Sequence, residues 1–320
     1  AARAADRLEA SSGRAANLLD EMAAATFEVI ADATFSGGPA IDRDSVHRAI
    51  EAYGMAAARM SFLDLVGAPA WVPRPARLRP APEMAAMKAL ADRVIAERRT
   101  RPAKTPPDLL DLLVGAEELD DRDVRDNLLA FIVAGHETTA LTLAWAFYLL
   151  GLDPEVQEAV RQEARAALGD RVAGPQDLPR LPLTRQVIDE TLRLYPPAGF
   201  LSRMAAEPDE LCGAQVVPGD TVTIPVYAVH RHRALWAEPD MFRPGRFAEP
   251  KAIPRYAYLP FGDGPRICIG ARFALQEAVI ILATLVARFR TTPIPGKTPT
   301  PTLIITLRPE PGVWQQIERV

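Results

Sequence analysis

The spacing of apolar residues divides the chain into a helical first two thirds and a mixed final third. Apolar side chains recur three and four positions apart, the period of an amphipathic helix, over residues 1–36, 42–60, 82–99, 120–152, 154–168 and 183–194. After Pro196 and Pro197 the pattern changes to short alternating runs at 200–204, 215–217 and 221–225, which predict strands. A further long apolar helix follows Gly270, and residues 301–319 predict a terminal hairpin. This order predicts a mainly α fold with small β-sheets.

The segments between these elements set the domain organisation. Residues 67–82 are rich in proline, which excludes a regular helix there. The helices on either side of this connection form either a mobile cover over a pocket or a static surface pair, and the sequence favours neither. No linker-like break divides the chain, so we expect one domain over residues 1–320 with a single large core. The centre of the run 120–152 is apolar nearly all the way round, which predicts a helix buried in the middle of the molecule.

Composition narrows the class of protein. The 320 residues are 48% hydrophobic and 24% charged, with a net charge of −4 and both signs interspersed. These values are typical of a globular protein and give no basis for nucleic-acid binding. No apolar run of membrane-spanning length and no signal peptide is recognisable in the sequence. The first residues, AARAADRLEA, lack a methionine and resemble the middle of a chain, so we expect that an N-terminal part is missing.

Only two cysteines occur, Cys212 and Cys268, too few for a disulfide scaffold. A single disulfide between them stays open, although a cytoplasmic, reducing compartment fits better. Cys268 lies in the stretch YAYLPFGDGPRICIG, residues 256–270, where glycines let the backbone turn tightly, approach a flat group and aim N–H groups at the sulfur. Arg266 adds a cation that can bind an anionic group. A helix follows directly, and a helix N-terminus favours a thiolate over a thiol.

The stretch AGHETT, residues 134–139, places residues in the buried helix that are costly there. Glycine and threonine have low helix propensity, a threonine can bond back to a carbonyl one turn earlier, and Glu137 is an acid in an apolar run. His136 and Glu137 suggest zinc, but H-E-x-x-H requires a histidine at position 140, which is Ala140. From these residues alone, a kinked core helix and a catalytic pair of Glu137 with Thr138 both stay open.

A third motif lies at the end of the helix over 183–194. Glu190 and Arg193 are three positions apart, so they share a helix face and can form an ion pair. Such pairs are common on ordinary helices, so the pair alone indicates little. The later segment FRPGRF, residues 242–247, offers Arg246 as a further partner for Glu190.

These motifs, in this order over about residues 15–315, resemble those of the cytochrome P450 family of the bacterial, soluble type. F-G-x-G-x-R-x-C-x-G resembles its haem-binding loop, [A/G]-G-x-[D/E]-T its oxygen-binding motif, and E-x-x-R with a later arginine its structural network. The family usually has P-E-R-F where this chain has Gly245 in place of the acid. Because Arg246 is intact, we expect the network of Glu190, Arg193 and Arg246 to survive and to brace the cysteine loop.

The resemblance implies a P450 fold with haem b between the long central helix and the helix after the cysteine, bound to iron through the Cys268 thiolate. Glu137 and Thr138 would supply protons for oxygen activation, with His136 a neighbour and not a ligand. The residues implied to contact the haem are Cys268, Arg266, Arg203, Phe261, Gly262, Gly270 and Ala134, with the two arginines at the propionates. Those implied to line a substrate pocket are Ala134, Thr138, Ala198, Gly199 and Phe200.

Two histidines in the segment VHRHRALW have no single implied role. His230 and His232 stand where the family often has H-R-D. One of them approaches a haem propionate, or they serve a surface role; the sequence supports the two alternatives equally.

The implied reaction inserts one oxygen atom of O2 into a largely apolar small molecule. Electrons would come from a separate ferredoxin or flavodoxin-type protein that docks near Arg255, Arg266 and Arg272. Two rivals stay open: a haem-thiolate sensor or store without turnover, and a peroxide-driven enzyme of the same fold. The pair of Glu137 and Thr138 argues against both, because neither depends on proton delivery to O2.

Overall fold

The computed structural model describes residues 1–35 and 82–320, which group into two compact units. The larger unit holds Ala1–Met22 and Thr138–Val320, and the smaller unit holds Ala23–Glu137. The helices α2 (Leu18–Phe35) and α7 (Asp121–Leu152) contribute residues to both units. The predicted helix over 42–60 and most of the proline-rich connection lie outside the described residues, so the two alternatives for a cover stay predictions.

The smaller unit is a helical cluster. Helices α5 (Pro82–Arg99) and α6 (Leu109–Val114) join parts of α2 and α7 in it. Helix α6 begins with a capping box, because the Asp111 N–H group donates to the Asp108 carboxylate at 2.9 Å and the Asp108 N–H group donates to Asp111 at 3.2 Å. One core cluster of this unit consists of the buried residues Phe27, Ile30, Met87, Ala91, Ile95, Leu110, Val124, Leu128, Leu129 and Ile132.

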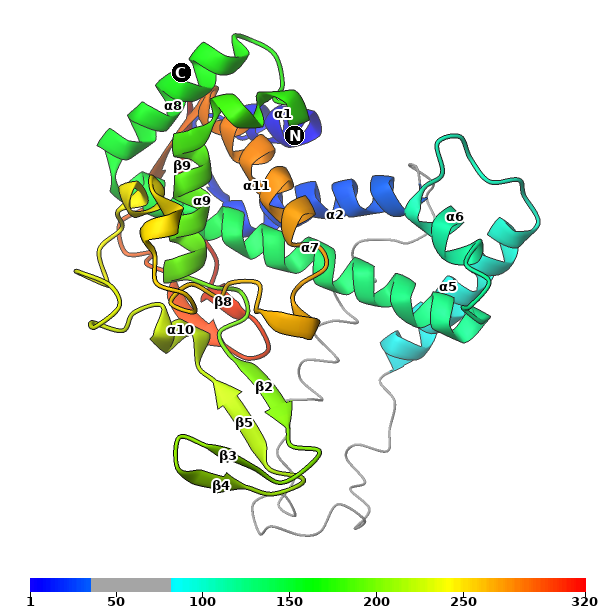
Figure 1. Cartoon of the computed structure of the whole chain (residues 1–320). Helices are drawn as coiled ribbons and strands as arrows, with labels where there is room; N and C mark the ends of the chain where they lie inside the picture. Colours follow the sequence, from blue (N-terminus) through cyan, green and yellow to red (C-terminus); the bar gives the residue numbers. More distant parts are fainter. Residues whose placement is uncertain (36–81) are drawn as a thin grey trace. The chain divides into compact units, whose positions relative to one another are not determined.

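Three helices of the larger unit pack against one another. Helices α8 (Pro154–Leu168), α9 (Pro182–Leu194) and α11 (Ala271–Val286) lie side by side (Figure 1). The carboxylate of Glu163 on α8 caps α9, since it accepts the backbone N–H groups of Leu183 and Thr184 at 2.6 and 2.8 Å. The remaining helical elements of this unit are α1 (Ala2–Ala10), α10 (Val226–Val229) and the 3-10 turns η2 (Pro175–Arg180), η3 (Pro244–Phe247), η4 (Pro250–Ala252) and η5 (Gly264–Arg266).

The strands of the larger unit form small antiparallel sheets. Three of them pair in the order β1-β9-β6, with β1 at Ala15–Asn17, β6 at Phe289–Pro293 and β9 at Trp314–Arg319. Three two-stranded ladders accompany this sheet. They pair β2 (Leu201–Met204) with β5 (Thr221–Ile224), β3 (Asp209–Leu211) with β4 (Ala214–Val216), and β7 (Thr300–Leu303) with β8 (Leu307–Glu310).

The mainly α class with small sheets is confirmed, and two predicted elements are wrong in part. Residues 1–36 are not one helix, because β1 interrupts them and pairs with β9 at the other end of the chain. Residues 301–319 are not one hairpin either. Strands β7 and β8 do form a hairpin, but β9 leaves it to join the three-stranded sheet. Both errors have the same cause: a strand is stabilised by a distant partner that local periodicity does not reveal.

Among the described helices, α7 alone is long and apolar enough to cross a membrane by length and composition, contrary to the sequence-based prediction that no run reaches that length. However, 61% of its most apolar 18-residue window is buried inside the protein. A core helix of a globular protein has the same properties, so α7 does not establish a membrane span.

Candidate functional site

The cysteine loop, which we define as residues 258–270, turns through two glycines in a conformation that disfavours other residues. Gly262 and Gly264 have φ angles of +72° and +74°, and this left-handed region costs a residue with a side chain about 1–2 kcal/mol. The Cys268 N–H group then donates to the Phe261 carbonyl at 2.9 Å. The loop is therefore closed by its own backbone, with the cysteine at its end.

Cys268 lies three residues before α11, and its thiol is free and exposed. The Ala271 N–H group donates to the Cys268 carbonyl at 3.4 Å, so one backbone turn joins the cysteine to the first residue of α11. The second cysteine, Cys212, is also free and exposed, in the β3–β4 turn where it has φ +53°. The disulfide that the sequence left open is therefore not formed.

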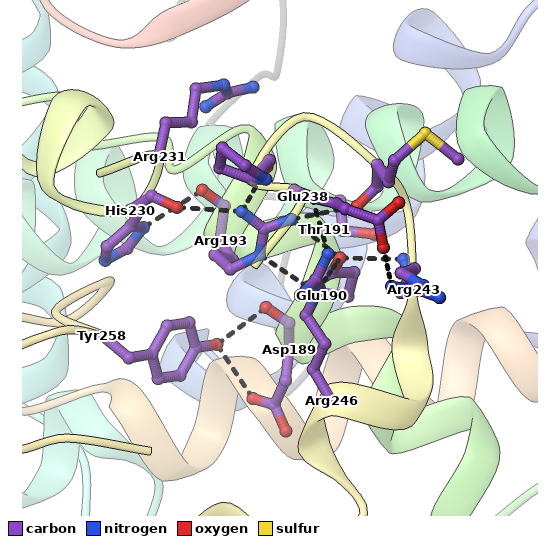
Figure 2. Close-up of polar contacts among 12 residues, drawn as sticks. Asp189, Glu190, Thr191, Arg193, His230, Arg231, Glu238, Arg243, Arg246 and Tyr258 are labelled. Atoms are coloured by element: carbon purple, nitrogen blue, oxygen red, sulfur yellow. Dashed lines mark hydrogen bonds and ion pairs between the residues drawn. The ribbon is translucent and has the colours of Figure 1, made fainter. Parts of the chain in front are cut away.

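A buried ion pair lies at the end of α9. Arg193 and Glu190 are both fully buried, and the Arg193 Nε and Nη2 atoms donate to the two Glu190 carboxylate oxygens at 2.7 and 2.8 Å (Figure 2). The remaining Arg193 N–H groups donate to the carbonyls of His230, Pro239 and Met241 at 2.9, 2.6 and 3.1 Å. All five guanidinium donors are thus used, which is what a buried arginine requires.

Arg246 joins this pair from η3. Its Nε atom lies 3.3 Å from Glu190 Oε1, and its other nitrogens donate to the carbonyls of Ala237 and Glu238. The same Glu190 oxygen accepts the Arg243 N–H group at 2.8 Å. Gly245, which stands in place of the acid usual in the family, has open space around it. The missing acid therefore leaves these contacts of Arg246 in place.

The start of the cysteine loop is attached to the same helix. The Tyr258 hydroxyl donates to the Asp189 backbone carbonyl and is also 3.0 Å from its carboxylate (Figure 2). The next residue, Leu259, donates its N–H group to His230 Nε2 at 2.7 Å. Burial raises the pKa of the Asp189 carboxyl, and Arg185 offsets part of that rise. Polar contacts from α9 and from His230 thus hold residues 258 and 259.

The motif AGHETT lies on α7, with residues 134–137 in the smaller unit. His136 is buried and donates from Nδ1 to the Ile132 carbonyl one turn earlier at 2.9 Å. Its ring is nearly perpendicular to that of Phe27, with the centroids 5.9 Å apart. The Thr26 hydroxyl donates to the His136 carbonyl at 2.8 Å. A methyl group on Gly135 would lie 3.1 Å from the Ile30 side chain, so close packing favours glycine there. His136 therefore serves helix packing in this unit.

Thr138 and Thr139 begin the part of α7 that belongs to the larger unit. The Thr142 hydroxyl donates back to the Thr138 carbonyl at 2.9 Å, the local bond expected of threonine inside a helix. On α11, Glu277 is 6% exposed, and neither carboxylate oxygen has a hydrogen-bond partner within the described part of the chain. Burial raises the pKa of Glu277 to about 8, and the nearby Thr139 side chain offsets part of that rise. Glu277 is therefore mostly protonated at pH 7.

Comparison with known proteins agrees with these motifs. The family model described as Cytochrome P450 matches residues 1–315. The chain belongs to the cytochrome P450 family. A P450 crystal structure, that of the cytochrome P450DA haem domain, superposes with a TM-score of 0.84 at 28% identity and covers 99% of this chain and 72% of that chain. The P450 fold implied by the sequence is therefore confirmed.

Several named P450 proteins are similar in sequence. Cyclooctat-9-en-7-ol 5-monooxygenase of Streptomyces melanosporofaciens is 38% identical over 89% of this chain and 64% of its own length. Cyclooctatin synthase of the same organism is 36% identical over 77% of this chain and 56% of its own length. A bifunctional P450/NADPH–P450 reductase of Bacillus subtilis is 40% identical over 63% of this chain and 20% of its own length. The chain thus spans roughly 56–64% of the length of the two Streptomyces relatives.

P450 membership implies a haem cofactor, and the residues around Cys268 fit one. The thiol is free, the glycine backbone leaves room beside it, and nearby apolar side chains are exposed: Ile269 at 86%, Ile267 at 54% and Phe273 at 43%. Soluble proteins rarely expose so many large apolar groups together unless they bind something there. A thiolate donor beside an apolar surface matches the chemistry of a haem ligand.

Other residues implied by the resemblance lie on the larger unit. Arg203 on β2 and Arg266 on η5 are both exposed, which leaves them accessible to anionic groups. Phe200 is 42% exposed, whereas Gly199 is buried and a methyl group there would lie 3.0 Å from Leu303. Ala134 is exposed on α7 in the smaller unit. These residues belong to different units, and their roles toward a haem or a substrate stay predictions.

One of the two histidines is now settled. His230 does not reach a propionate, because it is fully buried and both ring nitrogens are used, by the Arg193 carbonyl and the Leu259 N–H group. His232 is exposed and accepts the Ala234 N–H group at 3.3 Å. Three residues whose roles the structure shows were not identified from the sequence: Tyr258, Glu277 and the buried His230. The only signal in the sequence concerned Glu277, which is an acid within the apolar run that forms α11.

Proposed function

We propose that this chain is the haem-binding part of a P450 monooxygenase that inserts one oxygen atom of O2 into a largely apolar small molecule. Cys268, free at the helix end of a glycine-shaped loop, is the observation that carries the proposal. It is the iron ligand, and the cofactor is haem b. Arg203 and Arg266 bind the propionates, and Phe261, Gly262, Gly270 and Ala134 approach the ring. When bound, the haem supplies oxygen activation, which its thiolate ligand favours by donating electron density.

The chain's own residues have three tasks in this proposal. The cysteine loop and the start of α11 hold the Cys268 sulfur in place as the iron ligand. Glu137 and Thr138 pass protons toward the oxygen-binding side, with the acid as donor and the alcohol as the adjacent relay. Glu190, Arg193 and Arg246 keep the loop in place without contacting the reacting atoms.

The substrate class is part of the proposal. Thr138, Ala134, Ala198, Gly199 and Phe200 are small or apolar, apart from one hydroxyl, and favour an apolar ligand. The name of one relative specifies monooxygenation of cyclooctat-9-en-7-ol, an unsaturated alcohol with a mostly hydrocarbon body. Compounds of this kind are the first panel to test.

Electron supply and location complete the proposal. We place the donor on a separate ferredoxin or flavodoxin-type protein, in a bacterial cytoplasm. Arg255, Arg266 and Arg272 are exposed on either side of or within the cysteine loop and offer positive charge to an acidic partner. An Arg272→Glu variant should slow electron transfer at low salt, while Arg319→Glu, far along the chain and paired with Glu9, serves as the control.

The test of the reaction class uses isotopically labelled O2 with a donor system and the apolar panel. The proposal expects one labelled oxygen atom in the product and a reduced carbon-monoxide spectrum of the thiolate type. Cys268→Ser should abolish that spectrum, whereas Cys212→Ser, the matched exposed cysteine, should leave it unchanged. Product formation from peroxide alone, with no dependence on O2, would support the peroxide-driven rival. A thiolate spectrum without turnover on the panel would support the sensor.

A further inference from the structure

The first residues of the cysteine loop are attached to α9 through the side chains of Tyr258 and His230. Tyr258 reaches back to Asp189, and Leu259 donates its N–H group to His230. Leu259 comes two residues before Phe261, whose carbonyl accepts the Cys268 N–H group. The position of the loop therefore depends on what holds residues 258 and 259.

His230 is bonded on both sides of its ring. Nδ1 lies 3.2 Å from the Arg193 carbonyl oxygen, and Nε2 lies 2.7 Å from the Leu259 nitrogen. The His230 carbonyl in turn accepts from Arg193 Nη1 at 2.9 Å, and the ring lies 5.4 Å from that of Tyr258. The side chain is fully buried, so water does not replace either bond.

These two partners determine the protonation state of the imidazole. A carbonyl oxygen only accepts, so Nδ1 must carry a hydrogen; a backbone N–H group only donates, so Nε2 must be bare. The ring is therefore the neutral Nδ1–H tautomer. A second proton would place an N–H group on Nε2 directly against the Leu259 N–H group, 2.7 Å away.

We propose that His230 is a positioning residue for the cysteine loop. Its neutral ring is bonded to Arg193 on one side and to Leu259 on the other, so the position of the Leu259 backbone depends on that of the Glu190–Arg193 pair on α9. We call this connection the relay. Its meaning for catalysis rests on the proposed role of Cys268, but the structural relay does not. The relay links the motif that braces the fold to the loop that carries the cysteine, through one imidazole.

The charges around the ring favour the same state. Burial lowers the pKa of His230 to about 4, the backbone carbonyls of Arg193 and Leu192 oppose this, and the charges of Arg193 and Arg231 add to it. Glu190 faces Arg193 and is neutralised by it, and the nearby Tyr258 hydroxyl stays protonated because burial raises its pKa well above its usual value. No described carboxylate is bonded to the ring, so neutral His230 persists through physiological pH.

The first test measures the tautomer. The chain has four histidines, which makes nitrogen-15 imidazole labelling practicable, and His230→Gln identifies the signal. The expected spectrum shows a protonated Nδ1 and a bare Nε2 from pH 8 to pH 5, with titration only near pH 4. A ring that carries its hydrogen on Nε2, or that becomes charged above pH 6, overturns the inference.

The second test measures the loop. Gln places a side-chain acceptor where Nε2 stands, whereas Asn places a side-chain donor where Nδ1 stands, so the two variants separate the bonds. We expect amide hydrogen exchange of residues 259–268 to be about tenfold faster in His230→Leu and in His230→Asn, but close to the unmodified rate in His230→Gln. His232→Leu, at the exposed histidine two positions on, is the control and should change nothing in this segment.

The outcomes separate this inference from the proposed function. Equal exchange in the Leu, Asn and Gln variants overturns the relay, whatever the haem spectrum shows. If exchange follows the expected order, the relay holds, and the haem-loaded protein then reports on its use. His230→Leu should shift the reduced carbon-monoxide complex from the thiolate to the thiol form. Absence of any thiolate signal in the unmodified protein counts against Cys268 as ligand and leaves the relay standing.

Discussion

Replacing Glu277 with glutamine tests the electrostatics of the α7–α11 contact. Glu277 is 6% exposed, and its oxygens lack hydrogen-bond partners among the described residues. Burial raises its pKa from 4.5 to about 8. Because the folded pKa is the higher one, the acid imposes no penalty below pH 4.5, and stability is lost as the pH rises from 4.5 toward 8.

The size of the destabilisation follows from the pH range between the unfolded and the folded pKa of Glu277. At pH 7 the unfolded chain has lost the proton and the folded chain has kept it, so the penalty grows over about 2.5 pH units. At about 1.4 kcal/mol per unit this is about 3 kcal/mol at pH 7. Glutamine has nearly the same shape and no ionisation. Glu277→Gln should therefore match the unmodified protein at pH 4 and exceed its free energy of unfolding by about 3 kcal/mol at pH 7.

Guanidinium unfolding at intervals from pH 4 to pH 8 measures this difference. The exposed Glu249, changed to glutamine, is the matched control and should leave the pH dependence unaltered. An unchanged pH slope in Glu277→Gln, or a variant less stable than the parent at pH 8, would refute the reasoning.

Three further predictions concern other parts of the larger unit. Arg193→Lys replaces five hydrogen-bond donors, all of which are used, with three, so two buried hydrogen bonds are lost. The free energy of unfolding, measured by denaturant titration, should fall by about 3 kcal/mol, and an unchanged value would contradict this prediction. Gly264→Ala, at φ +74° in open space, should cost about 1 kcal/mol by the same assay, whereas Gly245→Ala, in open space at an ordinary φ, should cost far less. Asp177→Asn should lower the melting temperature at pH 7, because hydrogen bonds from Arg171, Gly174 and Arg180 hold the pKa of Asp177 below its usual value. The stability that these bonds contribute is present above pH 3.8 and is lost as the pH falls. The melting temperatures of the two proteins should therefore converge in acid.

Helix boundaries show how far sequence reasoning extends when the signals are local. The predicted helices 82–99 and 154–168 match α5 and α8 at both ends, because proline begins each and a charged end or Gly169 terminates it. The cysteine loop was equally readable, since its glycines adopt the left-handed conformations that glycine tolerates best. The roles that the resemblance implies for individual residues, including Glu137 and Thr138, stay proposals.

The errors arose where a residue's state depends on a distant partner. Residues 15–17 continue a helical pattern in sequence, yet they pair with residues 314–316 as β1 and β9. His230 was assigned either to a propionate or to the surface, but Arg193 and Leu259 enclose it. A pattern of neighbours in sequence contains no information on these contacts, because hydrogen bonds between segments are made only when the chain has folded.

The sequence by itself determined the helical class, the cysteine loop and the family, because periodicity, glycine placement and short motifs act within a few residues. Only the tertiary structure decided the pairing of β1 with β9, the neutral tautomer of His230 and the raised pKa of Glu277. Each of these depends on desolvation or on a donor brought from elsewhere in the chain. Burial and partner geometry are properties of the folded molecule, so no reading of local residues could have supplied them.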